Sequence, residues 1–196
     1  EFKLGTATKE IRNNGELVVV DTEKYGELEF EAVLHATGRR ANTEGLGLEN
    51  TDIELRPNGT IVVDEFCQTS VENVFAVGDV NGGLQFTYVS LDDFRVVNGY
   101  LHGNKEYTTA DRKNVPYSTF ISPALSHVGL HKEEAEAAYP NVAVASLPVA
   151  NMPRGAVNQD PRGLFRVTVD KDTNLILGAT LFGKNSEEII NLIKMA

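Results

Sequence analysis

The sequence predicts an α/β region followed by an α+β domain, in which helices flank an antiparallel sheet. Residues 74–77 (VFAV) form a fully apolar run that is typical of a strand in the middle of a parallel sheet, and this run ends at Gly78 and Asp79. Residues 104–114 are polar and poor in apolar side chains, which is typical of a linker. Beyond them, apolar residues alternate along the two arms of residues 163–183, and this pattern predicts a β-hairpin.

The N-terminal part reads mainly as β structure. Residues 17–22 and 27–37 are strand-like, and the NNG at 13–15 is a hairpin signal before the first of them. Residues 38–54 are rich in glycine and predict a loop. A turn then leads into a short predicted strand over residues 60–66.

Residues 87–103 predict an amphipathic helix that ends at Gly103. Its apolar side chains recur at spacings of three and four residues: Leu91, Phe94, Val97 and Leu101. Because side chains at this spacing share one face of a helix, we expect this face to be buried.

The second half of the chain changes character, and we expect a domain boundary near residue 112. Strands are predicted within residues 115–122, 125–130 and 141–150, with a short helix over 132–139 that Pro140 closes. The last predicted helix begins at Ser186 or Asn185 as its N-cap, with acidic residues in its first turn.

Composition bounds the partners and the compartment. The net charge of −10 argues against nucleic acid and anionic membranes as partners, because both require a basic surface. No apolar stretch approaches the roughly 20 residues of a membrane span. The single cysteine, Cys67, has no intramolecular partner for a disulfide, which suits a cytoplasmic protein.

The two ends lie inside predicted elements. The chain starts at Glu1 in a strand-like run and stops at Ala196 within an amphipathic helix that has no C-cap. We therefore expect the sequence to be a fragment of a longer protein.

Asp79 is the first candidate for a binding residue. A carboxylate at the end of an apolar strand is costly unless a donor is present. Gly78 leaves room for a ligand, and the two oxygens of Asp79 suit a sugar-like hydroxyl. The residues alone leave an alternative open, in which Asp79 only caps the following turn through backbone N–H groups.

Two further segments are candidates. ATGRR (36–40) places Gly38 after a strand, where backbone can approach a ligand, although a plain turn has the same pattern. The helix that opens near Thr87 offers free N–H donors to an electron-rich carbonyl or an anion, with Phe86 and Tyr88 as aromatic walls. The alternative there is an N-cap threonine beside core aromatics.

The remaining reactive residue types give weaker signals. The four histidines lie in different predicted elements and lack the spacing of metal ligands. Cys67 has no basic neighbour in sequence to lower its pKa, and we expect it to be inert. The sequence predicts no metal site and no catalytic residue in this chain.

The order of the motifs is more specific than any one of them. Five segments follow one another: ATGRRAN (36–42), IVVDEFCQTSVENVFAVGDV (61–80), LQFTYVSLDD (84–93), VPYSTFISPALSHVGLHKEEA (115–135) and LILGATLFGKNSEEIINLIKMA (175–196). In this order they resemble the FAD-dependent pyridine nucleotide-disulfide oxidoreductases, a family that includes glutathione reductase, dihydrolipoamide dehydrogenase and mercuric reductase. Residues 84–93 and the DRKNVPYS linker are similar to one bacterial subgroup, the reactive-chlorine-resistance flavoproteins, which are linked to copper(II) and hypothiocyanite reduction.

The resemblance implies roles for the candidate residues. Asp79, after Gly78, would accept hydrogen bonds from the ribityl chain of FAD. Residues 85–88 (Gln85, Phe86, Thr87 and Tyr88) would run along the isoalloxazine ring, with the Thr87 N–H facing the pyrimidine carbonyl. Gly38 would pass close to the nicotinamide cofactor, NADH or NADPH.

The resemblance also implies the organisation of the chain. Residues 1–45 would end the NAD(P)-binding domain, 46–112 would be a returning segment of the FAD-binding domain, and 113–196 would be a truncated dimerisation domain that forms a homodimer. The α/β region is thus a remnant of the two nucleotide-binding domains.

Several parts of the family pattern are absent from this sequence. They are the glycine loop for the ADP half of FAD, the redox cysteine pair, a complete NAD(P)-binding βαβ unit and the His-Pro and Glu segment that supplies the acid/base. The parent enzyme would pass electrons from NAD(P)H through FAD and the cysteine pair to a disulfide, metal-ion or oxidant substrate. We expect this chain alone to be inactive. The alternative is a non-catalytic binding or dimerisation module that retains the fold.

Overall fold

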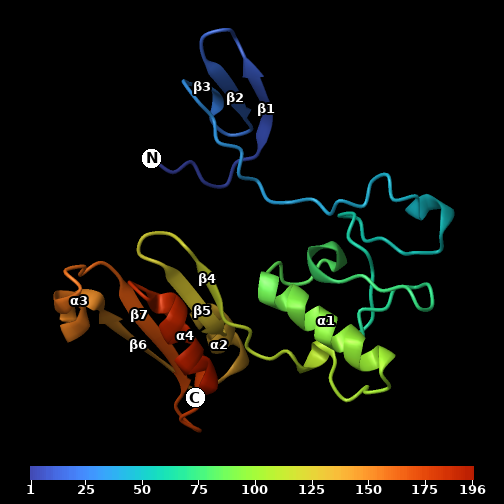
Figure 1. Cartoon of the computed structure of the whole chain (residues 1–196). Coiled ribbons are helices and arrows are strands. Elements are labelled where there is room, and N and C mark those ends of the chain that lie inside the picture. The colour runs from blue at the N-terminus through green and yellow to red at the C-terminus, as the bar shows by residue number, and fades with distance from the viewer.

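The computed structural model describes all residues, 1–196, and places them in three parts (Figure 1). A small β-sheet at the N-terminus lies apart from the rest. A loop-rich segment follows and leads into one long helix, α1 (Thr87–Leu101). A five-stranded sheet with its helices forms the C-terminal part.

The N-terminal sheet is antiparallel and has the order β1-β2-β3. Its strands are β1 (Thr8–Asn13), β2 (Val18–Thr22) and β3 (Gly26–Phe30). The predicted hairpin is confirmed: the Asn14 side chain accepts a hydrogen bond from the Leu17 N–H at 2.9 Å and closes the turn. The predicted strand over 27–37 is too long, since it ends at Phe30. No strand pairs with residues 31–37, and Leu34 is 90% exposed.

The loop-rich segment has little regular structure of its own. It contains two 3-10 turns, η1 (Leu48–Asn50) and η2 (Gly78–Asn81). The strands predicted over residues 60–66 and 74–77 are wrong for this chain, because each is reduced to a single bridge, Leu55 with Ile61 and Gln68 with Phe75. A strand needs hydrogen-bonding neighbours along its length, and no second strand of this chain flanks either run.

Helix α1 has the predicted extent but not the predicted buried face. Its buried side chains are Val89, Asp93 and Val96, whereas Leu91 is 52% exposed and Phe94 57% exposed. The turn of η2 packs against the side of α1 that carries Ser90, so that side turns inward. After α1 comes the 3-10 turn η3 (Thr109–Asp111), which has Thr108 as its N-cap.

The C-terminal sheet is antiparallel with the strand order β4-β5-β8-β7-β6. The register of β7 against β8 confirms the predicted hairpin, and Asn174 adopts the left-handed conformation in its turn. The strands of this sheet are β4 (Tyr117–Thr119), β5 (Leu125–Gly129), β6 (Val142–Pro148), β7 (Leu164–Asp170) and β8 (Ile176–Phe182).

Helices accompany this sheet, and α4 (Ser186–Met195) supplies its core (Figure 1). Ile190 of α4 packs against Val128, Ala179 and Leu181 of the sheet, and all four are less than 5% exposed. The predicted N-cap of α4 is confirmed at Asn185, although without a side-chain capping bond. The Ser186 hydroxyl instead donates to the Ala124 carbonyl at 2.9 Å. The other elements are α2 (Lys132–Ala138), η4 (Val149–Asn151) and α3 (Pro153–Val157).

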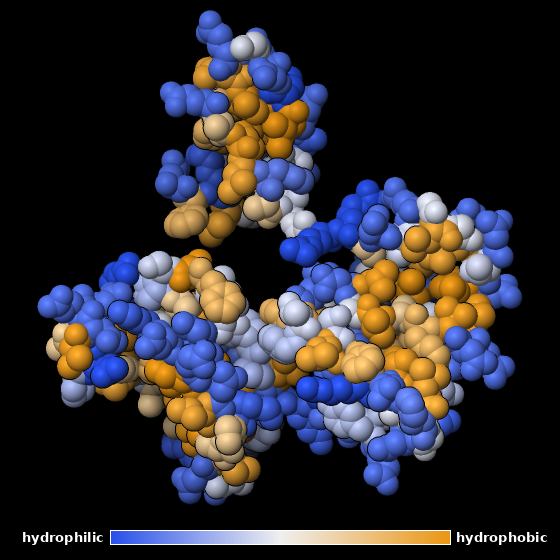
Figure 2. Space-filling model, viewed as in Figure 1, coloured by the Kyte–Doolittle hydropathy of each residue, from blue (hydrophilic) through white to orange (hydrophobic).

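Apolar side chains also lie on the surface of the first two parts. Figure 2 shows them over the N-terminal sheet and over the part that contains α1. None of the helices combines the length and the apolar character that crossing a bilayer requires.

Candidate functional site

The turn of η2 brings Gly78 against α1. Gly78 is buried and has a φ of +72°, a conformation that side-chain-bearing residues rarely adopt. A Cβ atom at this position would lie 2.8 Å from the Ser90 Oγ. The turn and its close contact with α1 therefore both require a glycine here, whether or not a ligand binds.

Asp79 is the residue that the turn presents to solvent. Its side chain is 48% exposed and lies 3.8 Å from Nη1 of Arg39, which is itself 79% exposed. The carboxylate accepts no backbone hydrogen bond in the structure, so it does not cap the turn. A long ion pair between exposed groups is weak, and both oxygens stay open to a hydroxyl donor.

Gly38 lies in the irregular segment after β3. It has a φ of +96°, and no heavy atom lies within 4 Å of the position that a Cβ would take. The neighbouring Arg39 connects this segment to Asp79 through the ion pair just described. Gly38 thus lies in an open turn with a left-handed backbone conformation, and the residue after it, Arg39, contacts Asp79 of the η2 turn.

The N-terminus of α1 carries the predicted donors. Phe86 is the N-cap and offers no side-chain cap. The backbone N–H groups of Thr87 and Tyr88 have no acceptor within the chain. A helix N-terminus with free N–H groups carries a partial positive charge, so it can stabilise a carbonyl or an anion.

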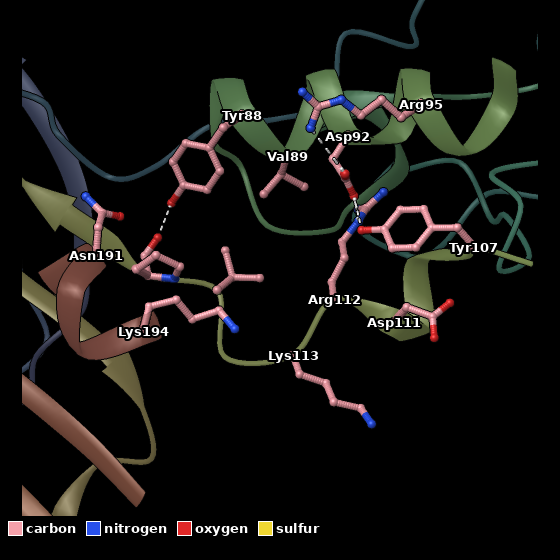
Figure 3. A pocket seen from close by; sticks show the side chains of 12 residues that line it. Tyr88, Val89, Asp92, Arg95, Tyr107, Asp111, Arg112, Lys113, Asn191 and Lys194 are labelled. Atoms are coloured by element: carbon pink, nitrogen blue, oxygen red, sulfur yellow. Dashed lines mark hydrogen bonds and ion pairs between the residues drawn. The ribbon is translucent and has the colours of Figure 1, made fainter. Parts of the chain in front are cut away.

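Residues 85–88 line one side of a cavity of about 450 Å³ between α1 and the C-terminal sheet, and its far side includes Ser118, Phe120 and Glu187. The rings of Phe86 and Tyr88 stack at a centroid distance of 5.3 Å with an interplanar angle of 9°. The Tyr88 hydroxyl donates to the Pro116 carbonyl at 2.5 Å, as the dashed line in Figure 3 shows.

The structure brings some of the predicted site residues together and leaves others apart. The contact between Gly78 and Ser90 places the η2 turn beside the first turns of α1. The cavity of about 450 Å³ is lined by four of the predicted residues, Gln85, Phe86, Thr87 and Tyr88. Gly38, Gly78 and Asp79 do not line it, and no larger cavity joins all the predicted residues.

The sequence analysis did not identify Asp93, which holds the η2 turn through hydrogen bonds. Oδ2 of Asp93 accepts hydrogen bonds from the Gly78 N–H at 2.6 Å and from the Asn81 side-chain amide at 2.9 Å. The sequence does contain a signal for its burial. Val89, Asp93 and Val96 recur at spacings of four and three residues, so they share one face of the helix, and this face is the buried one.

Cys67 is fully buried close to this carboxylate. Burial, together with the negative charge of Asp93, raises the pKa of its thiol to about 12, which supports the expectation of an inert cysteine.

We predict that native Cys67 does not react with iodoacetamide at about pH 8, because its thiolate is scarcely populated there. The same protein in denaturant should be alkylated at this residue. Mass spectrometry after alkylation measures both. Rapid modification of the folded protein would show that the site is open.

His127 and His131 correct the expectation that the histidines lie apart. Their rings stack at a centroid distance of 3.7 Å, since His127 lies in β5 and His131 follows four residues later as the N-cap of α2. Nδ1 of His127 is hydrogen-bonded to the Thr180 hydroxyl at 2.8 Å, and Nε2 is hydrogen-bonded to the Gly129 carbonyl at 2.9 Å. No group of three or more metal-ligating side chains is present in the structure.

We predict that His127 makes the protein less stable in acid. Burial lowers its pKa below the ordinary 6.5 and outweighs the bond to the Gly129 carbonyl, which raises it. The unfolded chain therefore binds the proton more readily. Stability is full above the unfolded pKa and falls as the pH drops below it. Thermal unfolding at about pH 7.5 and about pH 5.5 should show a larger drop for the parent than for His127→Gln. Equal drops would contradict this assignment.

Comparison with known proteins identifies matching families for both halves. Residues 1–93 match the sequence family described as pyridine nucleotide-disulphide oxidoreductase, and residues 115–196 match the dimerisation domain of the same description. The chain is 43% identical over 192 residues to a probable pyridine nucleotide-disulfide oxidoreductase, RclA, of Escherichia coli. It is 32% identical over 196 residues to glutathione reductase of Burkholderia cepacia.

Solved structures give the same picture. The HOCl-induced flavoprotein disulfide reductase RclA from Escherichia coli superposes with a TM-score of 0.88 at 43% identity over 96% of this chain. Its Cu(II) complex superposes with a TM-score of 0.89 at 42% identity. The alignment with RclA includes 98% of this chain but only 43% of the RclA sequence. The alignment with the glutathione reductase includes all of this chain but only 43% of that enzyme. This chain therefore spans less than half the length of these relatives.

Proposed function

We propose, from the premise that this chain belongs to the pyridine nucleotide-disulphide oxidoreductase family, that it is part of a flavin-dependent NAD(P)H oxidoreductase. The enzymes of this family depend on FAD and NAD(P)H. In the whole protein, electrons would pass from NAD(P)H through FAD and a cysteine pair to a disulfide, a metal ion or an oxidant. The Cu(II) complex of the Escherichia coli relative supports a metal ion among the acceptors.

Two observations carry the proposal together: the open carboxylate of Asp79 on the η2 turn, which packs against α1, and the free N–H groups at the N-terminus of α1. Asp79 accepts no hydrogen bond from the chain's own backbone, and its single ion pair is long and exposed. Acceptor oxygens of this kind suit the hydroxyls of a ribityl chain, and the N–H groups of Thr87 and Tyr88 suit a carbonyl of the flavin ring. The donors and acceptors present thus fit FAD.

Bound FAD would supply the two-electron chemistry that side chains cannot perform. The part of this chain would be to hold and to polarise it. The partial positive charge at the N-terminus of α1 favours negative charge on the reduced ring, and so raises its tendency to accept hydride. Phe86 would pack beside the ring, and the open turn at Gly38 would approach the nicotinamide cofactor.

We propose the following division of the chain. Residues 1–45 would belong to the NAD(P)-binding domain and 46–112 to the FAD-binding domain. The exposed apolar residues Val77, Leu91 and Phe94 support this, because the remainder of an FAD-binding domain would cover them.

Residues 113–196 would form the homodimer. The sheet face opposite α4 supports this proposal, because it holds an apolar hollow of about 360 Å³. Its lining includes Ile121, Leu125, Leu164 and Phe182. Apolar surface of this kind is typical of the core of a stable homodimer interface. We also propose a cytoplasmic location, since Cys67 is a free thiol.

A test is anaerobic titration of the whole protein with NADH and with NADPH. We expect at least one of them to bleach the visible flavin band, because hydride transfer reduces the ring. The second candidate function is a non-catalytic module that retains the fold. A folded protein that carries no flavin, or whose flavin neither cofactor reduces, would favour that module over the oxidoreductase.

A further inference from the structure

Asp93 is a buried acid in the middle of α1. Its side chain is only 1% exposed. An ionised carboxylate that is removed from water is costly unless donors and a positive charge surround it. The groups that contact Asp93 therefore indicate which parts of the molecule it holds in place.

One oxygen of Asp93 holds the turn that presents Asp79. Its Oδ2 accepts from the backbone N–H of Gly78 and from the side-chain amide of Asn81, which are the first and last residues of η2. Both donors are buried. Asp79 lies between them, so the direction of its carboxylate depends on a turn that Asp93 fixes at both ends.

The other oxygen faces the chain that enters the C-terminal part. Oδ1 of Asp93 lies 2.5 Å from Nη2 of Arg112, and neither atom has another partner. Arg112 also reaches Asp92, whose Oδ2 lies 2.5 Å from the Arg112 Nε. The Tyr107 hydroxyl donates to the same Asp92 oxygen at 3.0 Å. Figure 3 shows Asp92, Arg112 and Tyr107 pointing toward one another from α1 and the following segment.

Arg112 stays charged in this position. Burial is the largest single influence and lowers the pKa of its guanidinium, but the contacts with Asp93 and Asp92 and their negative charges together outweigh burial and raise the pKa. The guanidinium lies beside the buried Asp93 and offsets part of the cost of removing this acid from water. A carboxylate paired in this way holds the Gly78 N–H more strongly than a neutral acceptor would.

We propose that Asp93 is a positioning residue for the flavin, which sets the direction of Asp79 through the η2 turn and ties that turn to Arg112, the last residue before the proposed dimerisation domain. The inference rests on the proposed function, because it assigns Asp79 to FAD. It goes beyond that function in assigning a role to a residue that would not touch the cofactor. A purely structural ion pair would stabilise the protein without changing how tightly the folded protein binds FAD.

The test compares two identical changes at adjacent positions. Asp93→Asn and Asp92→Asn each remove one carboxylate charge from Arg112, but only Asp93 contacts the η2 turn. The whole protein would be stripped of FAD, and its FAD dissociation constant and the melting temperature of the apoprotein would be measured for both variants. We expect Asp93→Asn to weaken FAD binding about tenfold or more, and Asp92→Asn by less than about threefold.

The outcomes separate this inference from the proposed function. A parent protein that binds no FAD overturns the proposed function. A parent that binds FAD while Asp93→Asn binds it within about threefold, or while both variants weaken it equally, overturns the inference alone. Should Asp93→Asn fail to fold, Arg112→Lys keeps the positive charge but loses the two-armed contact. Weaker FAD binding in this variant than in Asp92→Asn supports the inference, and equal binding overturns it.

Discussion

Replacing Asp79 with alanine in the whole protein is expected to weaken FAD binding about 10- to 100-fold. The change would remove the acceptor proposed for the ribityl hydroxyls and leave the fold intact, because the Asp79 side chain is half exposed and makes no backbone hydrogen bond. Hydrogen bonds to a charged group are the stronger kind, which sets the size of the effect. The FAD dissociation constant of the reconstituted apoprotein is the measurement.

The matched control for Asp79 is Glu72→Ala. Glu72 is an exposed acid in the same segment, and its side chain makes no hydrogen bond or ion pair. We expect this variant to bind FAD as the parent does. If Asp79→Ala retains FAD unchanged, the assignment of this residue is wrong, whatever the control does.

The largest effect on stability is expected from Leu181→Ala. Leu181 has no exposed surface and packs with Ile190 of α4 at the centre of the C-terminal core. Its truncation should lower the free energy of unfolding by about 2–5 kcal/mol, because it removes buried apolar surface and leaves a cavity. Denaturant unfolding of the whole protein measures this loss, and sedimentation tests whether the dimer persists.

Leu175→Ala is the control for that change. Leu175 lies between β7 and β8 and is 64% exposed, so the same truncation should change stability by less than about 0.5 kcal/mol. Similar losses in the two variants would show that the core does not lie where the structure places it.

The C-terminal part could be predicted from sequence because its signals are local. The arms of the hairpin around Asn174 alternate in hydrophobicity, and the acidic first turn of α4 marks its start. The strands expected over residues 60–66 and 74–77 could not form. Their residues are suited to strands, but strand formation depends on partners, and this chain supplies only one bridge to each. The apolar periodicity also predicted the wrong buried face of α1. Leu91 and Phe94 follow a helical spacing, but no other part of this chain covers their side chains.

The candidate site was predictable in part. The glycine and acid after an apolar run indicated Gly78 and Asp79, and the structure adds that Asp79 does not cap its own turn. Asp93 was missed because its partners are distant in sequence: Gly78 is 15 residues away. A charged residue in a helix is usually solvated, and only the packed structure shows that this one is buried.

The flavin content of the whole protein tests the central claim most directly. The protein would be purified as it folds, denatured, and the released cofactor quantified against the chain by absorption and chromatography. We expect one FAD for each chain, held without a covalent bond. A folded dimer that releases no flavin, and takes up none when FAD is added, would contradict the assignment of Asp79 and of the α1 N-terminus to a flavin site.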